Sequence, residues 1–147
     1  MSDLAQIARN LQTLYLTEVL ERVVNEAEPL ILEMLRKQHT VQGLSGTGRD
    51  IGTYKSDRYA RMKNRQNPTV GRGRVDLELS GRYHERLNAR QQRLGVMEIE
   101  SGVDYEKYLT KRYGAKINRL TRENINEIIE KNIRPKFFKA VQDRIFR

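Results

Sequence analysis

The sequence predicts an α+β fold, with long helices at both ends of the chain and a small antiparallel sheet between them. Apolar residues recur at three- and four-residue steps from Leu4 to Leu35, which is the spacing of an amphipathic helix. Three short stretches have the residue pattern and the flanking turn residues that are typical of strands: 75–79, 88–93 and 95–100. The chain then returns to helical spacing towards its C-terminus.

The long N-terminal helix is expected to kink or break near Glu28. Pro29 follows directly, and a proline inside a helix removes one backbone donor and clashes with the carbonyl four residues earlier. The apolar stripe of this helix is longer than a small core can cover. The sequence therefore predicts that part of it contacts a partner.

A flexible, glycine-rich loop is expected over residues 40–53, which contain four glycines and no helical periodicity. The loop lacks the Gly-Lys-Ser/Thr ending of a phosphate-binding loop, so we interpret it as a connector. A short basic helix is predicted over Tyr54–Arg65, and Asn67-Pro68 ends it. Residues 70–74 then form a basic, turn-rich loop.

The predicted sheet begins at Val75–Leu79, whose alternation places Asp76 and Glu78 on one solvated face. Ser80 is expected to cap a short helix over residues 82–87. The stretches 88–93 and 95–100 then pair as a hairpin that turns at Leu94-Gly95.

The C-terminal third is predicted to be helical. Asp104 caps a helix that ends at Gly114, and Thr121 starts the next one. Pro135 marks a boundary, after which residues 137–147 form a last helix with a broad apolar face.

Charge is the strongest functional signal. The chain carries 28 Lys and Arg against 19 Asp and Glu, for a net charge of +9. Residues 41–93 alone hold twelve basic and five acidic residues. This excess suits nucleic acid or an acidic partner, although a solvated face that keeps the subunit soluble explains it equally. The candidate contact residues are Lys55, Arg58, Arg61, Lys63, Arg65, Arg72, Arg74, Arg82 and Arg86.

The composition argues against an enzyme. The 147 residues correspond to a single domain, 1–147, with no cysteine and only two histidines, so no metal site or cofactor is expected. No run is long and apolar enough to span a membrane, and no secretory signal is expected. His84 near Asp76 can be read as a general base, but we interpret it as a surface residue. The tyrosines of residues 105–113 are read as half-buried packing groups rather than a base-stacking set.

One region is similar to a known family. It runs from Asp76-Leu77-Glu78-Leu79-Ser80-Gly81-Arg82-Tyr83 to Gly102-Val103-Asp104-Tyr105-Glu106-Lys107-Tyr108. The order of a basic helix, this segment and a hairpin resembles the tail-completion and head–tail joining proteins of tailed bacteriophages. Ser80-Gly81 stands where the family has Thr-Gly, and Val103-Asp104-Tyr105 matches its Val-X-Tyr element. Glu106 departs from the small residue that is usual there, and Lys111-Arg112-Tyr113-Gly114 lacks the acidic residue before Gly.

The resemblance, which covers residues 54–114, implies a structural subunit of the virion neck or tail. Such a subunit assembles as a ring between portal and tail, inside the bacterial host cytoplasm. Its partners are further copies of itself, portal, adaptor or tail-tube proteins, and packaged DNA that it contacts without sequence preference. An alternative is a basic nucleic-acid-binding accessory protein, which the charge supports without the resemblance.

Overall fold

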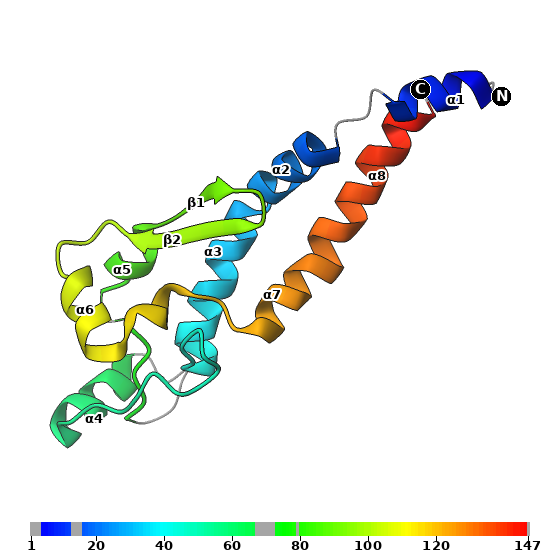
Figure 1. Ribbon diagram of the computed structural model, residues 1–147. Coiled ribbons are helices and arrows are strands. Elements are labelled where there is room, and N and C mark those ends of the chain that lie inside the picture. The colour runs from blue at the N-terminus through cyan, green and yellow to red at the C-terminus, as the bar shows by residue number, and fades with distance from the viewer. Residues whose placement is uncertain (1–3, 13–15, 67–72, 79, 147) are drawn as a thin grey trace.

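The computed structural model of the chain describes residues 4–12, 16–66, 73–78 and 80–146. It is elongated, with a mixed α/β body at one end and a helical arm at the other (Figure 1). We use "arm" for α1 (Leu4–Gln12), α2 (Leu16–Glu26) and α8 (Arg134–Ile145). Both termini lie at the tip of the arm, where the Asn10 side chain donates to the carbonyl of Ile145 at 2.8 Å.

The N-terminal helical region is divided into several elements. The predicted break is present at Ala27, between α2 and α3 (Glu28–Lys37), and Pro29 lies in the first turn of α3. A proline is tolerated there because the first-turn N–H groups have no partner within the helix. The expectation of one helix from Leu4 is matched only in part, because α1 and α2 are separate elements and residues 13–15 lie outside the described ones.

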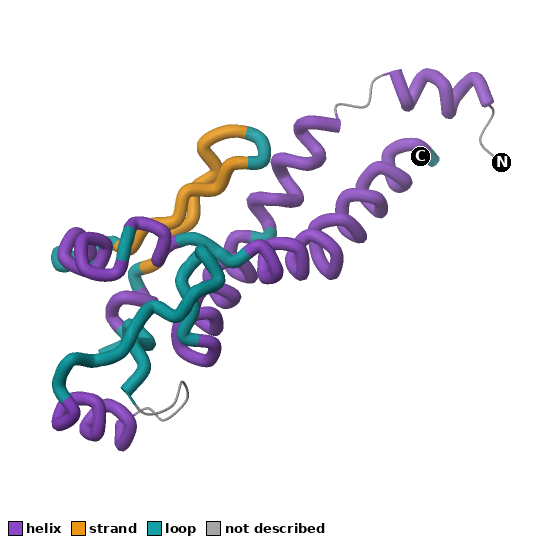
Figure 2. The backbone as a smooth tube through the Cα atoms, turned by 60° about the horizontal axis from the view of Figure 1, so that its bottom comes forward, coloured by secondary structure: helices purple, strands orange, loops and turns teal. Residues whose placement is uncertain are grey.

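The predicted hairpin is confirmed. Strand β1 (Leu87–Arg93) pairs antiparallel with β2 (Val96–Ser101), with Leu87 opposite Ser101 and an irregularity between Gln91 and Arg93. Gly95 makes the turn with a φ of 77°, a conformation that glycine adopts without strain. The hairpin, which is drawn in orange in Figure 2, lies alongside α3.

The predicted third strand at 75–79 is wrong for residues 75–78, and Leu79 lies outside the described residues. Val75 and Asp76 are both buried, which an alternating half-buried strand does not allow. Leu77 has a φ of 59°, and the Asp76 carboxylate accepts a hydrogen bond from the Glu78 N–H. This local turn prevents the segment from extending, so the sheet has two strands.

Four short helical elements complete the body. They are α4 (Asp57–Gln66), α5 (Arg82–Glu85), α6 (Glu106–Tyr113) and the 3₁₀ turn η2 (Ala115–Asn118). Two of the predicted caps are wrong: Gly81, with a φ of 79°, precedes α5 in place of Ser80, and Tyr105 precedes α6 in place of Asp104. Gly114 ends α6 as predicted.

The C-terminus is helical, as predicted. Helix α7 (Arg122–Ile128) begins at Thr121, whose hydroxyl accepts from the Asn124 N–H. The π turn η3 (Ile129–Ile133) connects α7 to α8. Pro135 lies in the first turn of α8, so the proline coincides with an irregular turn rather than with an end of the helical run.

The core lies in the body, on both sides of α3. One cluster centres on Leu35, Tyr83, Leu87 and Val103. The other centres on Ala27, Ile31 and Ile128, and Ile99 and Leu120 pack against both clusters. Neither cluster takes a described residue from α1, α2 or α8, so the main core does not extend into the arm.

The glycine-rich segment packs against the body. Its first residues belong to the π turn η1 (Gln38–Gln42), which ends at Gly43 with a φ of 67°. The Gly46 N–H donates to the carbonyl of Lys116 at 2.9 Å, and the Ile51 N–H donates to the Gly43 carbonyl at 2.9 Å. The loop is therefore docked on η2. Its expected flexibility stays a prediction.

Candidate functional site

Lys63 differs from the other candidate basic residues because it is buried. Its side chain is 4% exposed and its Nζ lies 3.1 Å from Oδ1 of Asp76; it also donates to the carbonyl of Glu78. Lys63 therefore anchors α4 to residues 76–78. The prediction that Lys63 contacts DNA or an acidic partner is wrong, because its ammonium group is buried and paired with Asp76.

Asp76 is the centre of this buried network. Besides Lys63, its Oδ1 accepts from the Tyr54 hydroxyl at 3.0 Å and from the Glu78 N–H at 2.9 Å. Burial and the neighbouring carboxylate raise the pKa of Tyr54, which keeps its hydroxyl protonated as a donor. The expectation that Asp76 lies on a solvated face is wrong.

The remaining candidates outside α4 are placed differently. Arg74 donates to the Gln42 carbonyl at 2.7 Å and to Oδ1 of Asp50 at 2.8 Å, which holds it against the glycine-rich loop. Arg82 and Arg86 are exposed on and just after α5. Arg72 lies outside the described residues.

The exposed side of α4 carries a group of basic residues that form no ion pair within the described part of the chain. Arg58, Arg61 and Arg65 are exposed and follow each other at steps of three and four residues, which places them on one face of the helix. We call these three residues the arginine stripe. With Ser56, Tyr59, Met62 and Gln66 they line a shallow hollow. Lys55 is also exposed, just before the helix.

Two histidines form a buried pair that joins three elements of the body. Nδ1 of His39 lies 3.1 Å from Nε2 of His84, and Nε2 of His39 lies 2.7 Å from the Ile117 carbonyl. Because a carbonyl only accepts, His39 carries its proton on Nε2 and accepts from His84 at Nδ1. Burial lowers the pKa of both histidines to about 4. The interpretation of His84 as a surface residue is wrong.

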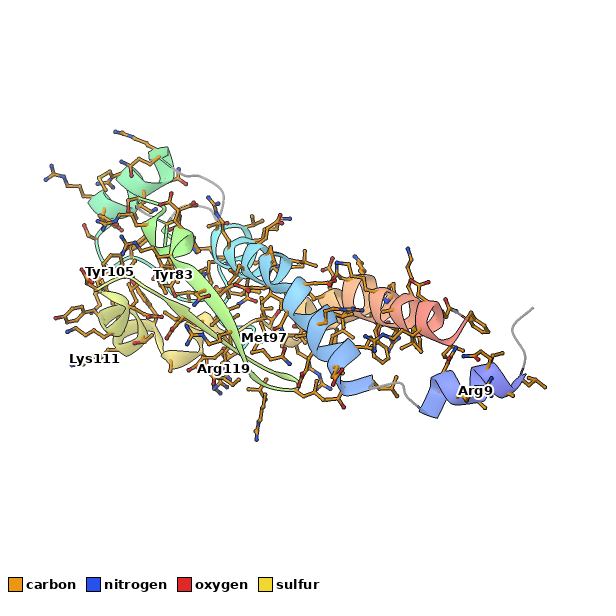
Figure 3. The ribbon with its side chains drawn as sticks, turned by 90° about the horizontal axis from the view of Figure 1, so that it is seen from above. Arg9, Tyr83, Met97, Tyr105, Lys111 and Arg119 are labelled. Atoms are coloured by element: carbon orange, nitrogen blue, oxygen red, sulfur yellow. The ribbon has the colours of Figure 1, made fainter. Side chains whose placement is uncertain are left out.

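A pocket of about 300 Å³ opens between α4, α5 and α6. It is lined by Tyr54, Tyr59, Tyr83, Tyr105 and Tyr113, with Leu77 and Leu109 among its apolar residues. Tyr83 and Tyr105 lie at the body end of Figure 3, away from Arg9 on the arm. Tyr105 and Tyr113 thus contribute to the pocket wall, whereas Tyr108 is 63% exposed and packs under the Lys107 ammonium.

The arm and Phe146, which directly follows α8, expose apolar side chains that the described residues do not cover. Leu4 is 81% exposed, Phe138 57% and Phe146 63%. Leu11 and Leu16 are also among the exposed apolar residues. Helix α2 has one covered side, where Val19, Val23 and Val24 are buried. Helices α2 and α8 are in contact. The opposite sides of these helices remain exposed.

Sequence reasoning missed the polar residues at the end of α3. Gln38 is fully buried: its Oε1 accepts from the Thr121 N–H and from the Asn124 side chain, and its Nε2 donates to the Arg119 carbonyl. These contacts fix η1 against the start of α7. Only a contact more than 80 residues away in sequence identifies Gln38 as internal, and no local pattern carries that information.

The described residues contain no group of three or more His, Cys, Asp or Glu side chains arranged to hold a metal ion. Among the described helices, none is long and apolar enough to cross a membrane. Comparison with protein-family models, with curated proteins and with solved structures found no match.

Proposed function

We propose that this protein is a structural subunit of a phage virion neck or tail that assembles as a ring between portal and tail. The resemblance of residues 54–114 to tail-completion and head–tail joining proteins supports the class of protein. The exposed apolar side of the arm supports assembly, and it is the observation on which the proposal mainly depends.

Helices α1 and α8 of the arm bury little within their own subunit, whereas α2 buries Val19, Val23 and Val24. No residue of α8 is buried, and α1 exposes Leu4 and Leu11. Burying an exposed leucine or phenylalanine side chain contributes about 1.5–3 kcal/mol, so several such residues together are a substantial driving force for association. Contact with a neighbouring subunit is the simplest way to bury these side chains.

The charges of α2 and α8 are complementary, both for the contact that these helices make within the chain and for a contact between copies. Helix α2 carries Glu18, Glu21 and Glu26 but only one basic residue, Arg22. Helix α8 carries four basic residues and one acidic residue. A contact between α2 of one copy and α8 of the next brings opposite charges together. Such a contact uses two different surfaces, and a repeated heterologous contact gives a ring when its rotation closes.

Light scattering over a range of concentrations tests assembly. We expect the wild-type mass to rise with concentration to a defined oligomer, with rings visible by electron microscopy. The double variant Phe138→Gln/Phe146→Gln should require a much higher concentration, because it removes apolar area from the contact. The matched control is Val41→Gln/Leu94→Gln, which removes two exposed apolar residues from the body.

Equal association of the two double variants would contradict an arm-based interface. The gene neighbourhood supplies a second, independent test. Genes for portal, capsid and tail proteins are expected next to the gene for this chain. A neighbourhood without any virion genes would contradict the proposal as a whole.

A further inference from the structure

We propose that the arginine stripe of α4 binds the phosphate backbone of double-stranded DNA without sequence preference. The structure removes two of the basic candidates, because Lys63 is buried and Arg74 is paired with Asp50, and it places three of the exposed candidates on one face of α4. The inference does not depend on ring assembly, since the stripe lies on a single subunit.

The stripe is not neutralised within the described part of the chain. No ion pair there involves Arg58, Arg61 or Arg65, and Asp57 is the one acidic residue of α4. The ion pairs that do form engage other basic side chains, namely Arg22, Arg36, Lys37, Lys63, Arg74, Lys131 and Arg134. Within the described part of the chain, three guanidinium groups on one helix face therefore have no acidic partner.

The spacing and the residue type suit a row of phosphates. The seven helical steps from Arg58 to Arg65 span about 10 Å, which equals about three charges along one DNA strand. A guanidinium group can bind a phosphate with two parallel hydrogen bonds. Each arginine can thus meet one phosphate of a continuous backbone.

The opposite face of α4 fixes the direction in which the stripe points. Ala60 and Lys63 are buried, and the ion pair of Lys63 with Asp76 holds the helix to the body. The helix lies at the end of the molecule opposite the arm (Figures 1 and 2). A DNA duplex on the stripe therefore does not compete with a neighbouring copy on the arm.

The surroundings of the stripe favour DNA backbone over bases and over an acidic protein. Tyr59 packs edge-on against Tyr54, with 4.9 Å between ring centroids, so it is not presented as a stacking platform. Protein interfaces depend on buried aromatic or apolar anchors, and Met62 is the single large exposed apolar residue of α4. Backbone contact alone predicts binding that ignores sequence.

The test is fluorescence anisotropy with two labelled duplexes of about 20 base pairs and unrelated sequence, over about 50–300 mM NaCl. We expect equal affinity for both duplexes. In Arg58→Gln/Arg61→Gln/Arg65→Gln, affinity at low salt should fall at least about tenfold, and the slope of log affinity against log salt should become shallower by about 2.7, or 0.9 for each lost contact. The triple Arg→Lys variant should keep the salt slope.

The matched control is Arg90→Gln/Arg93→Gln/Arg122→Gln, which removes the same charge from exposed positions elsewhere. It should keep the wild-type slope, and circular dichroism should show that both triple variants remain folded. Equal losses in both variants, no binding by the wild type at low salt, or tighter binding of polyglutamate than of DNA would each overturn the proposal. Light scattering on the same samples reports assembly separately, so failure here leaves the ring proposal standing.

Discussion

Lys63 shows how one residue of a basic run acquires a role that its neighbours do not share. It lies two positions from Arg61 and Arg65, yet it points into the body while they point to solvent. A buried ammonium is tolerated only with close partners, and Lys63 has the Asp76 carboxylate and the Glu78 carbonyl. These contacts of Lys63 attach α4 to one place on the body, residues 76–78.

Asp76→Asn should therefore destabilise the protein strongly. The substitution keeps the shape of the side chain but leaves the Lys63 charge buried without a counter-ion, which typically costs about 3–5 kcal/mol. Urea unfolding at neutral pH measures the loss. The double variant Lys63→Met/Asp76→Asn should be less destabilised than Asp76→Asn alone, because it removes the unpaired charge. The exposed Arg22–Glu26 pair supplies a control: Glu26→Gln should leave the unfolding midpoint unchanged.

The histidine pair works only in its neutral form. Nδ1 of His39 must accept from His84, while Nδ1 of His84 is buried and has no partner. Burial is the largest cause of the low pKa of His84. The nearby charges of Arg36 and Lys63 lower this pKa further, and the Asp76 carboxylate raises it. A proton on either ring thus introduces a poorly solvated charge between η1, α5 and η2.

Stability should fall as pH decreases through the window between about 6.5 and about 4. Burial holds the pKa of both histidines at about 4 in the folded protein, against an ordinary value of 6.5 in the unfolded chain, so the unfolded chain binds more protons in this window. Each contributes a loss of up to about 1.4 kcal/mol per pH unit, and no loss from these groups is expected above pH 7. Urea midpoints between pH 7.5 and 5 measure it, and His84→Gln should reduce the slope. Histidine NMR signals that titrate near pH 6.5 would contradict buried neutral rings.

At the scale of elements, the glycine-rich loop matters through its contact with η2. Gly46 lies so close to the neighbouring chain that an added Cβ would sit 2.4 Å from Cβ of Arg119 and 2.7 Å from the carbonyl oxygens of Arg119 and Lys116. The absence of a side chain thus permits the hydrogen bond from Gly46 to Lys116. Glycine is therefore needed at position 46 for this close approach, and that need says nothing about whether the loop is flexible.

Gly46→Ala should destabilise the protein by more than about 1 kcal/mol, because backbone atoms on both sides must shift to admit the methyl group. Gly102→Ala is the matched control, since its Cβ would meet only the Arg86 carbonyl at 3.9 Å. Thermal unfolding of the two variants measures the difference. Equal midpoints would show that the loop leaves η2 at little cost.

At the scale of the whole molecule, stability is distributed unevenly between body and arm. The two core clusters and the buried polar residues of η1 and α7 all lie in the body, whereas the buried residues of the arm's described helices are Val19, Val23 and Val24 of α2. Opening of a segment costs little free energy where few side chains are buried. The tip of the arm, formed by α1 and the end of α8, is therefore the least stable part of the isolated subunit.

Hydrogen exchange should reveal this gradient. In the monomer, amides of α1 and of the last turns of α8 should exchange well before those of α3 and α7. On assembly, the same amides of the arm should become protected, because subunit contact buries them. Mass spectrometry of protein digests measures both states. Protection of α1 equal to that of α3 in the monomer would contradict this distribution.

The sequence by itself determined the elements whose signals are local. The break before Pro29, the hairpin turn at Gly95, the cap at Thr121 and the end of α6 at Gly114 each follow from the backbone preferences of a few adjacent residues. Periodicity likewise predicted the helical C-terminus, and the charge pattern pointed to the region that contains the arginine stripe.

Tertiary structure alone decided which polar residues are inside. Three buried contacts join residues that are far apart in the sequence: Asp76 lies 13 residues from Lys63, His84 lies 45 from His39, and Thr121 lies 83 from Gln38. A pattern of adjacent residues cannot predict such contacts. Local alternation placed Asp76 in a strand, but its buried partners stabilise a turn instead. The reason is that burial of a polar group is governed by the partner that replaces water, and that partner comes from a distant part of the chain.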